Sequence, residues 1–301
     1  MPKSRPEEPL VPLRSLDELW FQVGGTLCNL ECNHCFISCS PQNNSFGFLD
    51  FDSVAQRLEE SQRFGVKEYY FTGGEPFLNK DLPRILEEAL KYGPATVLTN
   101  GIVFTQRLVD KLHTIASASR YSLELRVSID GYTAKMNDPI RGEGTFVSAM
   151  KGVHQLVEAG FLPIITMTQT WPHEETANVF KRFTRLLKEN GYERPRIKIL
   201  PTIHLGMEET RSRPYQADER ITRDMLDSFD LDNLLCHHSR IVTDRGVAVC
   251  PLLIEQPNAH RGTTLGEATQ PFAVTHNACF TCYLYGTICS NSGAALSQTD
   301  R

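Results

Sequence analysis

Three kinds of segment are missing from the 301-residue sequence. No apolar run approaches the roughly 18 to 20 residues that span a bilayer, and residues 1–9 lack the apolar core of a signal peptide. No block of Lys and Arg occurs, and the formal net charge is −5. Because phosphate binding depends on clustered basic residues, a nucleic acid is not expected as the main partner. These absences predict a cytoplasmic protein that acts neither in a membrane nor on nucleic acid.

Cysteine is also missing from the middle of the chain. Four of the nine cysteines lie within residues 28–39, none lies between 40 and 235, and five follow. An odd number of cysteines in a chain expected to be cytoplasmic favours metal sites over a disulfide framework. We therefore expect two metal-binding regions separated by a cysteine-free scaffold.

The first cysteine group is a C-x3-C-x2-C motif formed by Cys28, Cys32 and Cys35, just after an apolar stretch at residues 19–23. Soft thiolate ligands select iron-sulfur clusters, zinc or copper. A structural zinc ion takes four protein ligands, so three cysteines indicate an open metal site. Cys39 is a possible fourth ligand, which would give a closed cluster or an unusual zinc knuckle.

Apolar runs alternate with predicted helices after this motif. We expect strands at residues 19–23, 67–72, 95–99, 123–129, 162–169 and 196–200, and helices at residues 52–64, 81–92, 105–118, 145–159 and 175–189. This alternation predicts an α/β fold with a parallel sheet and right-handed crossovers, forming an open or complete barrel.

Four polar or glycine-rich motifs lie at the C-terminal ends of these strands. In a β/α barrel the chemistry is carried by the loops at this rim, so the placement predicts one common site. Strand by strand, the motifs are Cys28, the turn Gly73-Gly74-Glu75-Pro76, Asn100, and the pair Ser128 and Asp130.

Together with Arg141-Gly142, these motifs resemble the radical S-adenosylmethionine (SAM) superfamily over roughly residues 16–200. The resemblance implies that Cys28, Cys32 and Cys35 hold a 4Fe-4S cluster whose fourth iron is chelated by SAM. It also implies reductive cleavage of SAM to methionine and a 5′-deoxyadenosyl radical, which removes a hydrogen atom from the substrate. The electron would come from a donor such as flavodoxin or ferredoxin.

The resemblance further implies a SAM contact for each motif. The glycine-rich turn would receive the amino group, and Ser128 and Asp130 would meet the ribose and methionine parts. Arg141 is the candidate clamp for the carboxylate, because a guanidinium group matches a carboxylate with paired donors. His34 departs from the aromatic residue that many members carry here, although an imidazole can still stack on adenine. The expected cofactor-binding residues are Gly73, Gly74, Glu75, Pro76, Asn100, Ser128, Asp130, Arg141 and His34.

The strand at residues 123–129 allows a second interpretation. One face carries the polar residues Glu124, Arg126, Ser128 and Asp130. A polar row inside a barrel needs a ligand or mutual hydrogen bonds, so a buried structural network including Glu124 and Arg126 is the alternative to SAM binding. Thr168 and Thr170 are weaker candidates for lining a substrate chamber. Cys39 is either a small buried residue or a catalytic hydrogen-atom donor to a substrate radical.

The second cysteine group surrounds a predicted β-hairpin whose turn lies at residues 244–246. From spacing alone, a zinc ion and an iron-sulfur cluster are equally expected here. Behind a radical SAM-like core, the arrangement resembles the twitch extension, the shortened relative of the SPASM domain, and implies one auxiliary 4Fe-4S cluster. Cys289 is then a spare thiol or an alternative ligand. The expected ligands are Cys236, Cys250, Cys279 and Cys282.

We therefore expect a partial (β/α)6 radical SAM barrel in residues 16–229 and a small cysteine-rich twitch-like domain in residues 230–301. A cluster with four cysteine ligands has no open iron for a substrate, so electron transfer is its expected role. This role favours net oxidation, a dehydrogenation, over the alternatives of epimerisation, cyclisation and peptide maturation. A non-enzymatic electron carrier is the competing class, but it would have no use for the SAM-binding motifs.

The N-terminal segment bears on the class of substrate. Only about fifteen residues precede the first strand, fewer than the peptide-binding domain of many peptide-modifying members would need. We therefore expect a small-molecule substrate or a peptide delivered by another protein.

Overall fold

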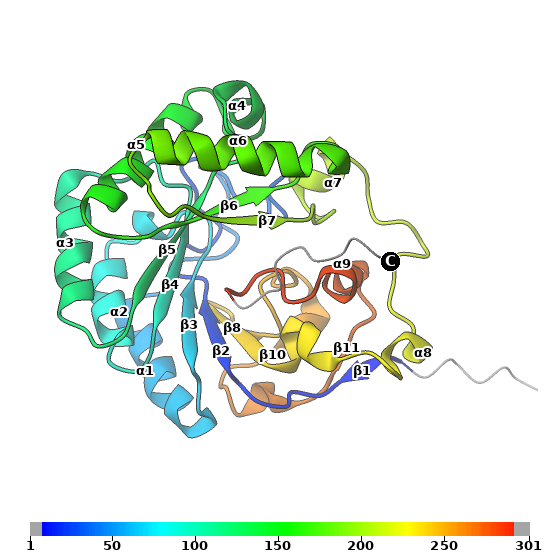
Figure 1. The fold of residues 1–301 in the computed structure, drawn as a ribbon. Coiled ribbons are helices and arrows are strands. Elements are labelled where there is room, and N and C mark those ends of the chain that lie inside the picture. Colours follow the sequence, from blue (N-terminus) through cyan, green and yellow to red (C-terminus); the bar gives the residue numbers. More distant parts are fainter. Residues whose placement is uncertain (1–7, 292–301) are drawn as a thin grey trace, which may run out of the picture.

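The computed structural model describes residues 8–291, and its centre is a curved sheet of nine strands (Figure 1). The strand order is β10-β9-β8-β2-β3-β4-β5-β6-β7. The six strands of the predicted barrel run parallel as neighbours: β2 (Glu18–Phe21), β3 (Glu68–Phe71), β4 (Ala95–Thr99), β5 (Leu123–Ser128), β6 (Ile164–Thr168) and β7 (Arg196–Leu200). Within residues 8–291, β7 pairs with β6 alone, so the predicted partial barrel of six strands is confirmed.

Helices separate the parallel strands and cover the outer face of the sheet (Figure 1). Two of them begin at residues whose side chains cap the first turn. Asp50 accepts a hydrogen bond from the Ser53 backbone N–H at 2.8 Å, and Thr105 accepts one from that of Leu108 at 3.3 Å. The outer helices are α1 (Phe51–Ser61), α2 (Leu82–Ala89), α3 (Gln106–Ser117), α5 (Thr145–Glu158) and α6 (Thr176–Glu189).

Alternation along the strands separates an apolar outer face from a polar inner face. Phe21, Phe71, Val97 and Leu125 are buried with the helices in the main core, and each such side chain contributes roughly 1.5 to 3 kcal/mol to folding. The residues between them face the concave side, which the sheet encloses. Examples on that side are Trp20, Tyr70, Thr96, Leu98 and Arg126.

A short helix, α4 (Ala134–Arg141), follows β5 and was not predicted from the sequence. It contains Pro139, a residue that normally breaks a helix interior, so the local sequence favours a loop here. The helix ends at Gly142, whose φ of 112° suits a residue without a Cβ atom. As a result, Arg141 is carried on the last turn of a helix rather than on a loop.

The C-terminal region extends the same sheet. The predicted hairpin is present as β8 (Ser239–Thr243) and β9 (Gly246–Ala248), and β10 (His260–Gly262) pairs with β9. Strand β8 pairs in parallel with β2, so the sheet continues across the predicted boundary between residues 229 and 230. The division into two domains at that boundary stays a prediction.

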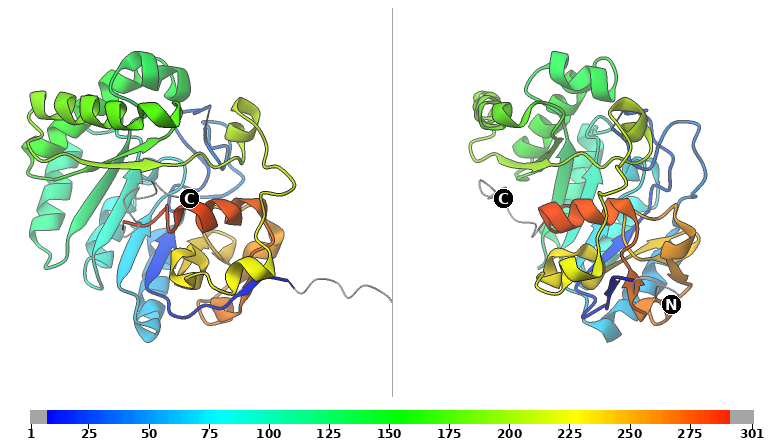
Figure 2. Two further views of the ribbon diagram at one scale, coloured as in Figure 1. Left: turned by 45° about the vertical axis from the view of Figure 1, so that its right-hand side comes forward. Right: turned by 90° about the vertical axis from the view of Figure 1, so that its right-hand side faces the viewer.

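Smaller elements complete the chain. Strand β1 (Leu10–Val11) pairs with β11 (Phe272–Ala273), which ties the start of the described chain to its C-terminal region. Helix α9 (Asn277–Tyr285) follows, and Figures 1 and 2 show it beside the open side of the curved sheet. The short helices are α7 (Met207–Arg211) and α8 (Arg223–Leu226), with 3-10 turns η1 (Gln62–Phe64), η2 (Pro76–Leu78), η3 (His173–Glu175), η4 (Leu231–Asn233), η5 (Leu235–His237), η6 (Pro257–Ala259) and η7 (Glu267–Thr269).

Among residues 8–291, no helix is both long and apolar enough to span a bilayer.

Candidate cofactor site and second cysteine pocket

The first cysteine group lines a cavity at the C-terminal rim of the parallel strands. This cavity measures about 990 Å³ with its open mouth included. Each of the four rim motifs predicted from the sequence contributes to its wall. The predicted site residues on the lining are Cys28, Cys32, His34, Cys35, Cys39, Gly73, Gly74, Asn100, Ser128 and Arg141. The remaining three, Glu75, Pro76 and Asp130, are buried outside that lining.

Hydrogen bonding distinguishes Cys35 from the other cysteines of this group. The Cys39 backbone N–H donates to the Cys35 Sγ atom at 3.2 Å, and hydrogen bonding from the Cys39 thiol lowers the pKa of Cys35 to about 6. Burial raises the pKa of Cys28 to about 12 and that of Cys32 to about 11. Because a thiolate is the form that binds metal, cluster assembly would release protons from Cys28 and Cys32. The thiol of Cys39 lies beside Cys35, and its predicted catalytic role stays a prediction.

The two glycines after β3 allow the cysteine loop to pack against the rim. A Cβ atom on Gly74 would lie 2.0 Å from the Leu27 carbonyl oxygen, and one on Gly73 would lie 2.8 Å from the Gly24 backbone. The Gly74 backbone N–H donates to the Gly25 carbonyl at 2.9 Å. Any larger residue here would push the cysteine loop away from the strand ends.

Glu75 faces the protein interior rather than the cavity. Its carboxylate accepts hydrogen bonds from the Asn100 backbone N–H at 2.8 Å, the Thr99 hydroxyl at 2.8 Å and the Phe77 backbone N–H at 3.1 Å. Burial nevertheless raises the pKa of Glu75 to about 7. The side chain therefore joins the loop after β3 to the end of β4, where Asn100 in turn donates to Asn29 at 2.7 Å.

A buried charge cluster lies behind Cys32. The Asp130 Oδ2 atom is 2.7 Å from Arg141 Nε and 2.8 Å from His34 Nε2, and Oδ1 accepts from the Thr168 backbone N–H at 2.7 Å. Burial alone would raise the pKa of Asp130, but Arg141 and His34 hold it well below its usual range. Arg141 also reaches the Cys32 Sγ atom at 4.0 Å. Asp130 thus orients two cavity-lining side chains.

The polar face of β5 does not form the closed network considered as the alternative to SAM binding. Glu124 pairs with Arg196. Arg126 bonds instead to the Thr166 hydroxyl and to the backbone of Cys289. Among the weaker candidates, Thr168 lines the cavity, whereas Thr170 is absent from its lining.

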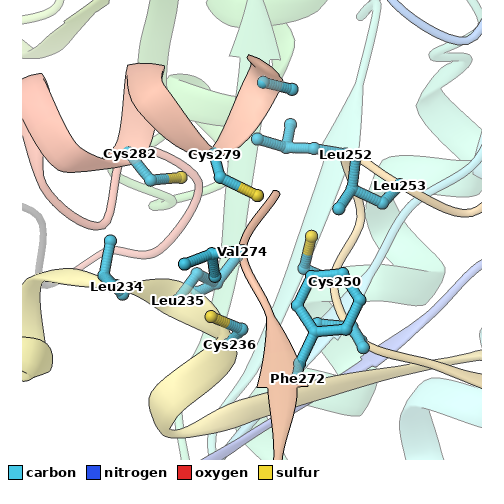
Figure 3. Close-up of a pocket in the computed structure, with 12 residues that line it drawn as sticks. Leu234, Leu235, Cys236, Cys250, Leu252, Leu253, Phe272, Val274, Cys279 and Cys282 are labelled. Carbon is cyan, nitrogen blue, oxygen red and sulfur yellow. The ribbon is translucent and has the colours of Figure 1, made fainter. Parts of the chain in front are cut away.

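The four predicted ligands of the second group line one apolar pocket. Cys236 comes from η5, Cys250 follows β9, and Cys279 and Cys282 lie one turn apart on α9. Figure 3 shows the four sulfur atoms pointing into the same space among leucine, valine and phenylalanine side chains. Cys289 does not line this pocket but packs, partly buried, against the apolar clusters of both cysteine groups.

The four thiols of the second group are buried and neutral. In the described part of the chain, neither cysteine group nor any other set of three His, Cys, Asp or Glu side chains is spaced to hold a single metal ion. Burial raises the pKa of Cys236 to about 11 and that of Cys250 to about 12, so the metal-free pocket holds neutral thiols. Four cysteines around one apolar pocket supply the ligand number of a 4Fe-4S cluster and also that of a structural zinc ion.

Two features of the site were not predicted from the sequence. Arg126 lines the cavity together with the first cysteine group, and its position on the polar face of β5 could have indicated this. Residues 287–291 enter the concave side of the sheet and bond to side chains of β3, β4, β5 and β7. No local pattern in the sequence indicates this insertion.

Comparison with known proteins places the chain in a family. A model of the radical SAM superfamily matches residues 23–187. The mycofactocin maturase MftC of Mycobacterium tuberculosis (strain ATCC 25618 / H37Rv) is 29% identical over 167 residues, which cover 54% of this chain and 41% of the relative. The GTP 3′,8-cyclase of Psychromonas ingrahamii is 30% identical over 139 residues, covering 45% and 39%. The chain thus spans about two fifths of the length of these curated relatives.

Solved structures share the fold at low sequence identity. Native anSMEcpe with bound AdoMet has a TM-score of 0.61 at 14% identity, and the match covers 87% of this chain and 81% of that structure. Streptococcus suis SuiB bound to S-adenosylmethionine has a TM-score of 0.60 at 15% identity, covering 82% and 62%. The matched family model spans more than half of the chain, from the end of β2 to α6. The chain therefore belongs to the radical SAM superfamily.

Proposed function

We propose that this protein cleaves SAM reductively and uses the resulting 5′-deoxyadenosyl radical to oxidise a small-molecule or peptide substrate. One observation carries the proposal: three cysteines, the Gly73-Gly74 backbone and Arg141 line a single cavity at the rim of the barrel. A 4Fe-4S cluster held by Cys28, Cys32 and Cys35 would supply the electron that cleaves SAM.

The residues around the cavity have distinct parts in binding SAM. The backbone of Gly73 and Gly74, which lines the cavity, would offer carbonyl oxygens to the SAM amino group, and Arg141 would offer its guanidinium group to the SAM carboxylate. Asp130 holds Arg141 in place through the 2.7 Å ion pair. Glu75 would not contact SAM. Its hydrogen bonds to Thr99 and Asn100 fix the turn that contains the two glycines.

The second pocket supports a net oxidation. Four cysteines around one apolar space would complete the coordination of an auxiliary 4Fe-4S cluster and leave no iron open to a substrate. Such a group can accept the electron that a substrate radical loses. Cys289 packs against the apolar clusters of both cysteine groups, which favours a short electron-transfer path between the two groups.

Of the two proposed substrate classes, small molecule and peptide, the relatives lend support to the peptide. MftC is a maturase, and SuiB has also been solved with its precursor peptide SuiA. An electron carrier without catalytic activity is the competing function. The buried cluster of His34, Asp130 and Arg141 beside the cysteines argues against it, because an electron carrier needs no carboxylate clamp.

The test is anaerobic reconstitution followed by assays for iron, sulfide and 5′-deoxyadenosine. We expect 5′-deoxyadenosine from the reconstituted protein with SAM and dithionite. None should form when Cys28, Cys32 and Cys35 are all replaced by alanine. A protein that binds iron and sulfide but never cleaves SAM would be an electron carrier instead.

A further inference from the structure

Arg126 is a buried cation on the wall of the candidate active site. It lies on β5 two residues before Ser128, is 1% exposed, and lines the same cavity as the cluster cysteines. A strand rises about 3.3 Å per residue, so Arg126 lies about 7 Å deeper in the barrel than the rim position of Ser128. It is therefore placed below the level of the proposed SAM contacts.

Within the described chain, the hydrogen-bond partners of this guanidinium group are neutral. Its Nε atom donates to the Thr166 hydroxyl at 3.4 Å, and Nη1 donates to the Cys289 carbonyl oxygen. Lys198 on β7 is a second inward-facing cation, and it donates to the Ser290 carbonyl oxygen. Among residues 8–291, no carboxylate lies within ion-pair distance of either cation.

The carboxylate of Glu18 acts on both cations electrostatically. Glu18 on β2 raises the pKa of both cations, and its carboxylate accepts hydrogen bonds from Trp20 Nε1 at 3.3 Å and from the Ser290 side chain. Burial also raises the pKa of Glu18 to about 7. Burial and the nearby Arg126 lower the pKa of Lys198 to about 8, which leaves it mostly protonated at neutral pH. Glu18 thus stands near both cations without forming an ion pair with either of them in the described chain.

A buried cation without an anionic partner is costly, and a carboxylate is the ligand that a guanidinium group binds best. The backbone carbonyls of Cys289 and Ser290 stand where carboxylate oxygens would bind. They belong to the segment of residues 287–291, in which Asn291 bonds to Tyr70 and to Thr96 at 2.9 Å each and the Ser290 side chain bonds to Glu18. Displacement of this segment would free both cations.

We infer that Arg126, assisted by Lys198, binds a carboxylate of the substrate inside the barrel, and that residues 287–291 hold the place of that carboxylate until the substrate enters. The inference deepens the proposed function and rests on it. Either a free acid or an acidic side chain of a peptide can supply the carboxylate.

The experiment measures carboxylate binding by calorimetry on the reconstituted, SAM-loaded protein, in which SAM already occupies Arg141. Glutarate and the capped peptide Ac-Ala-Glu-Ala-NH2 are the probes, and glutaramide and the corresponding glutamine peptide are their neutral controls. We expect a charged probe to bind and its neutral control not to bind. Arg126→Gln should weaken binding by about tenfold or more, with partial rescue by Arg126→Lys. Arg196→Gln, at the exposed ion pair with Glu124, should leave binding unchanged.

A second variant separates ligand binding from simple anchoring of the segment. Asn291→Ala removes the bond to Thr96 without touching either cation, so it should tighten binding of the charged probe if the segment competes with it. Equal binding by wild type and Arg126→Gln, or no binding by either charged probe, would overturn the inference and leave Arg126 as an anchor. SAM cleavage is assayed in parallel, so that a failure of the proposed function is seen separately from a failure of carboxylate binding.

Discussion

Arg141 and Asp130 form the ion pair on which SAM binding is expected to depend most. Arg141 lines the cavity, whereas Asp130 is fully buried behind it and contacts the cavity through Arg141 and His34. This geometry makes Asp130 a positioning residue. A direct contact between Asp130 and the ribose, as implied by the family resemblance, would require the carboxylate to leave these partners.

Arg141→Ala should weaken SAM binding by roughly 1.5 to 3 kcal/mol, about ten- to a hundredfold, because one charge-assisted hydrogen bond is lost. Asp130→Asn should also weaken binding in the wild type but add little in the Arg141→Ala background, since both changes disturb the same contact. SAM affinity of the cluster-loaded variants measures this coupling, with Arg196→Ala as a matched surface control. Independent, additive losses would mean that Asp130 touches SAM itself.

Glu75 should make stability depend on pH. Its pKa is raised to about 7 in the folded state, so the stabilisation by its protonated form is complete below the unfolded value of about 4.5 and is lost as pH rises through about 7. Relative to Glu75→Gln, the free energy of unfolding of the metal-free wild type should fall by about 3 kcal/mol between pH 4.5 and pH 8. Glu189→Gln, at an exposed position of α6, is the control. Parallel pH profiles of wild type and Glu75→Gln would contradict this prediction.

At the scale of elements, α9 decides whether the second pocket can hold a cluster. It carries Cys279 and Cys282 one turn apart, so that both sulfur atoms face the pocket between η5 and β9. The helix and the hairpin come from segments about thirty residues apart, and they meet because the apolar residues around the cysteines pack together.

Replacing Cys279 and Cys282 by alanine should lower the iron content from about eight to about four per chain. The variant should still cleave SAM with dithionite, because the first cysteine group is unchanged, but should not complete turnover of the substrate. Replacement of Cys28, Cys32 and Cys35 should also leave about four irons and abolish cleavage. Circular dichroism must show that the C-terminal region stays folded, since metal loss can unfold such a region. One zinc and four irons in the wild type would contradict the auxiliary cluster.

At the scale of the whole molecule, the barrel and the C-terminal region share one sheet. Strand β2 lies between β3 and β8, with Glu18 to Phe21 paired to both neighbours. Removing β8 would expose the edge of β2, and unpaired strand edges promote aggregation. The two regions are therefore expected to unfold together rather than as independent domains.

A fragment of residues 1–229 tests this expectation. We predict that it is less stable than the full chain, aggregates more readily and binds SAM weakly, because β2 loses a neighbour and β1 loses its partner β11. Thermal unfolding and size-exclusion chromatography compare it with the intact chain. A monomeric fragment with the melting temperature and SAM affinity of the full chain would instead support an independent domain ending at residue 229.

The sequence by itself determined the elements and the motifs, because both depend on neighbouring residues. Alternating apolar runs predicted six parallel strands, and the predicted hairpin is β8–β9. Because the motifs follow the strand ends, they were predicted to share one rim of the barrel. The cysteines at residues 28, 32 and 35 line the cavity there. Helix α4 was not predicted, because Pro139 disfavours a helix locally. In the folded protein the packing of this segment after β5 outweighs that local preference.

Tertiary structure alone decided how distant segments meet. It turned Glu75 and Asp130 away from the cavity and toward donors on other strands, and it paired β8 with β2. It also brought Cys289 and its neighbours against Arg126 inside the barrel. Each of these contacts joins residues at least 25 positions apart in the chain. Such contacts depend on complementary surfaces that exist only once the sheet has formed, and no local periodicity encodes them.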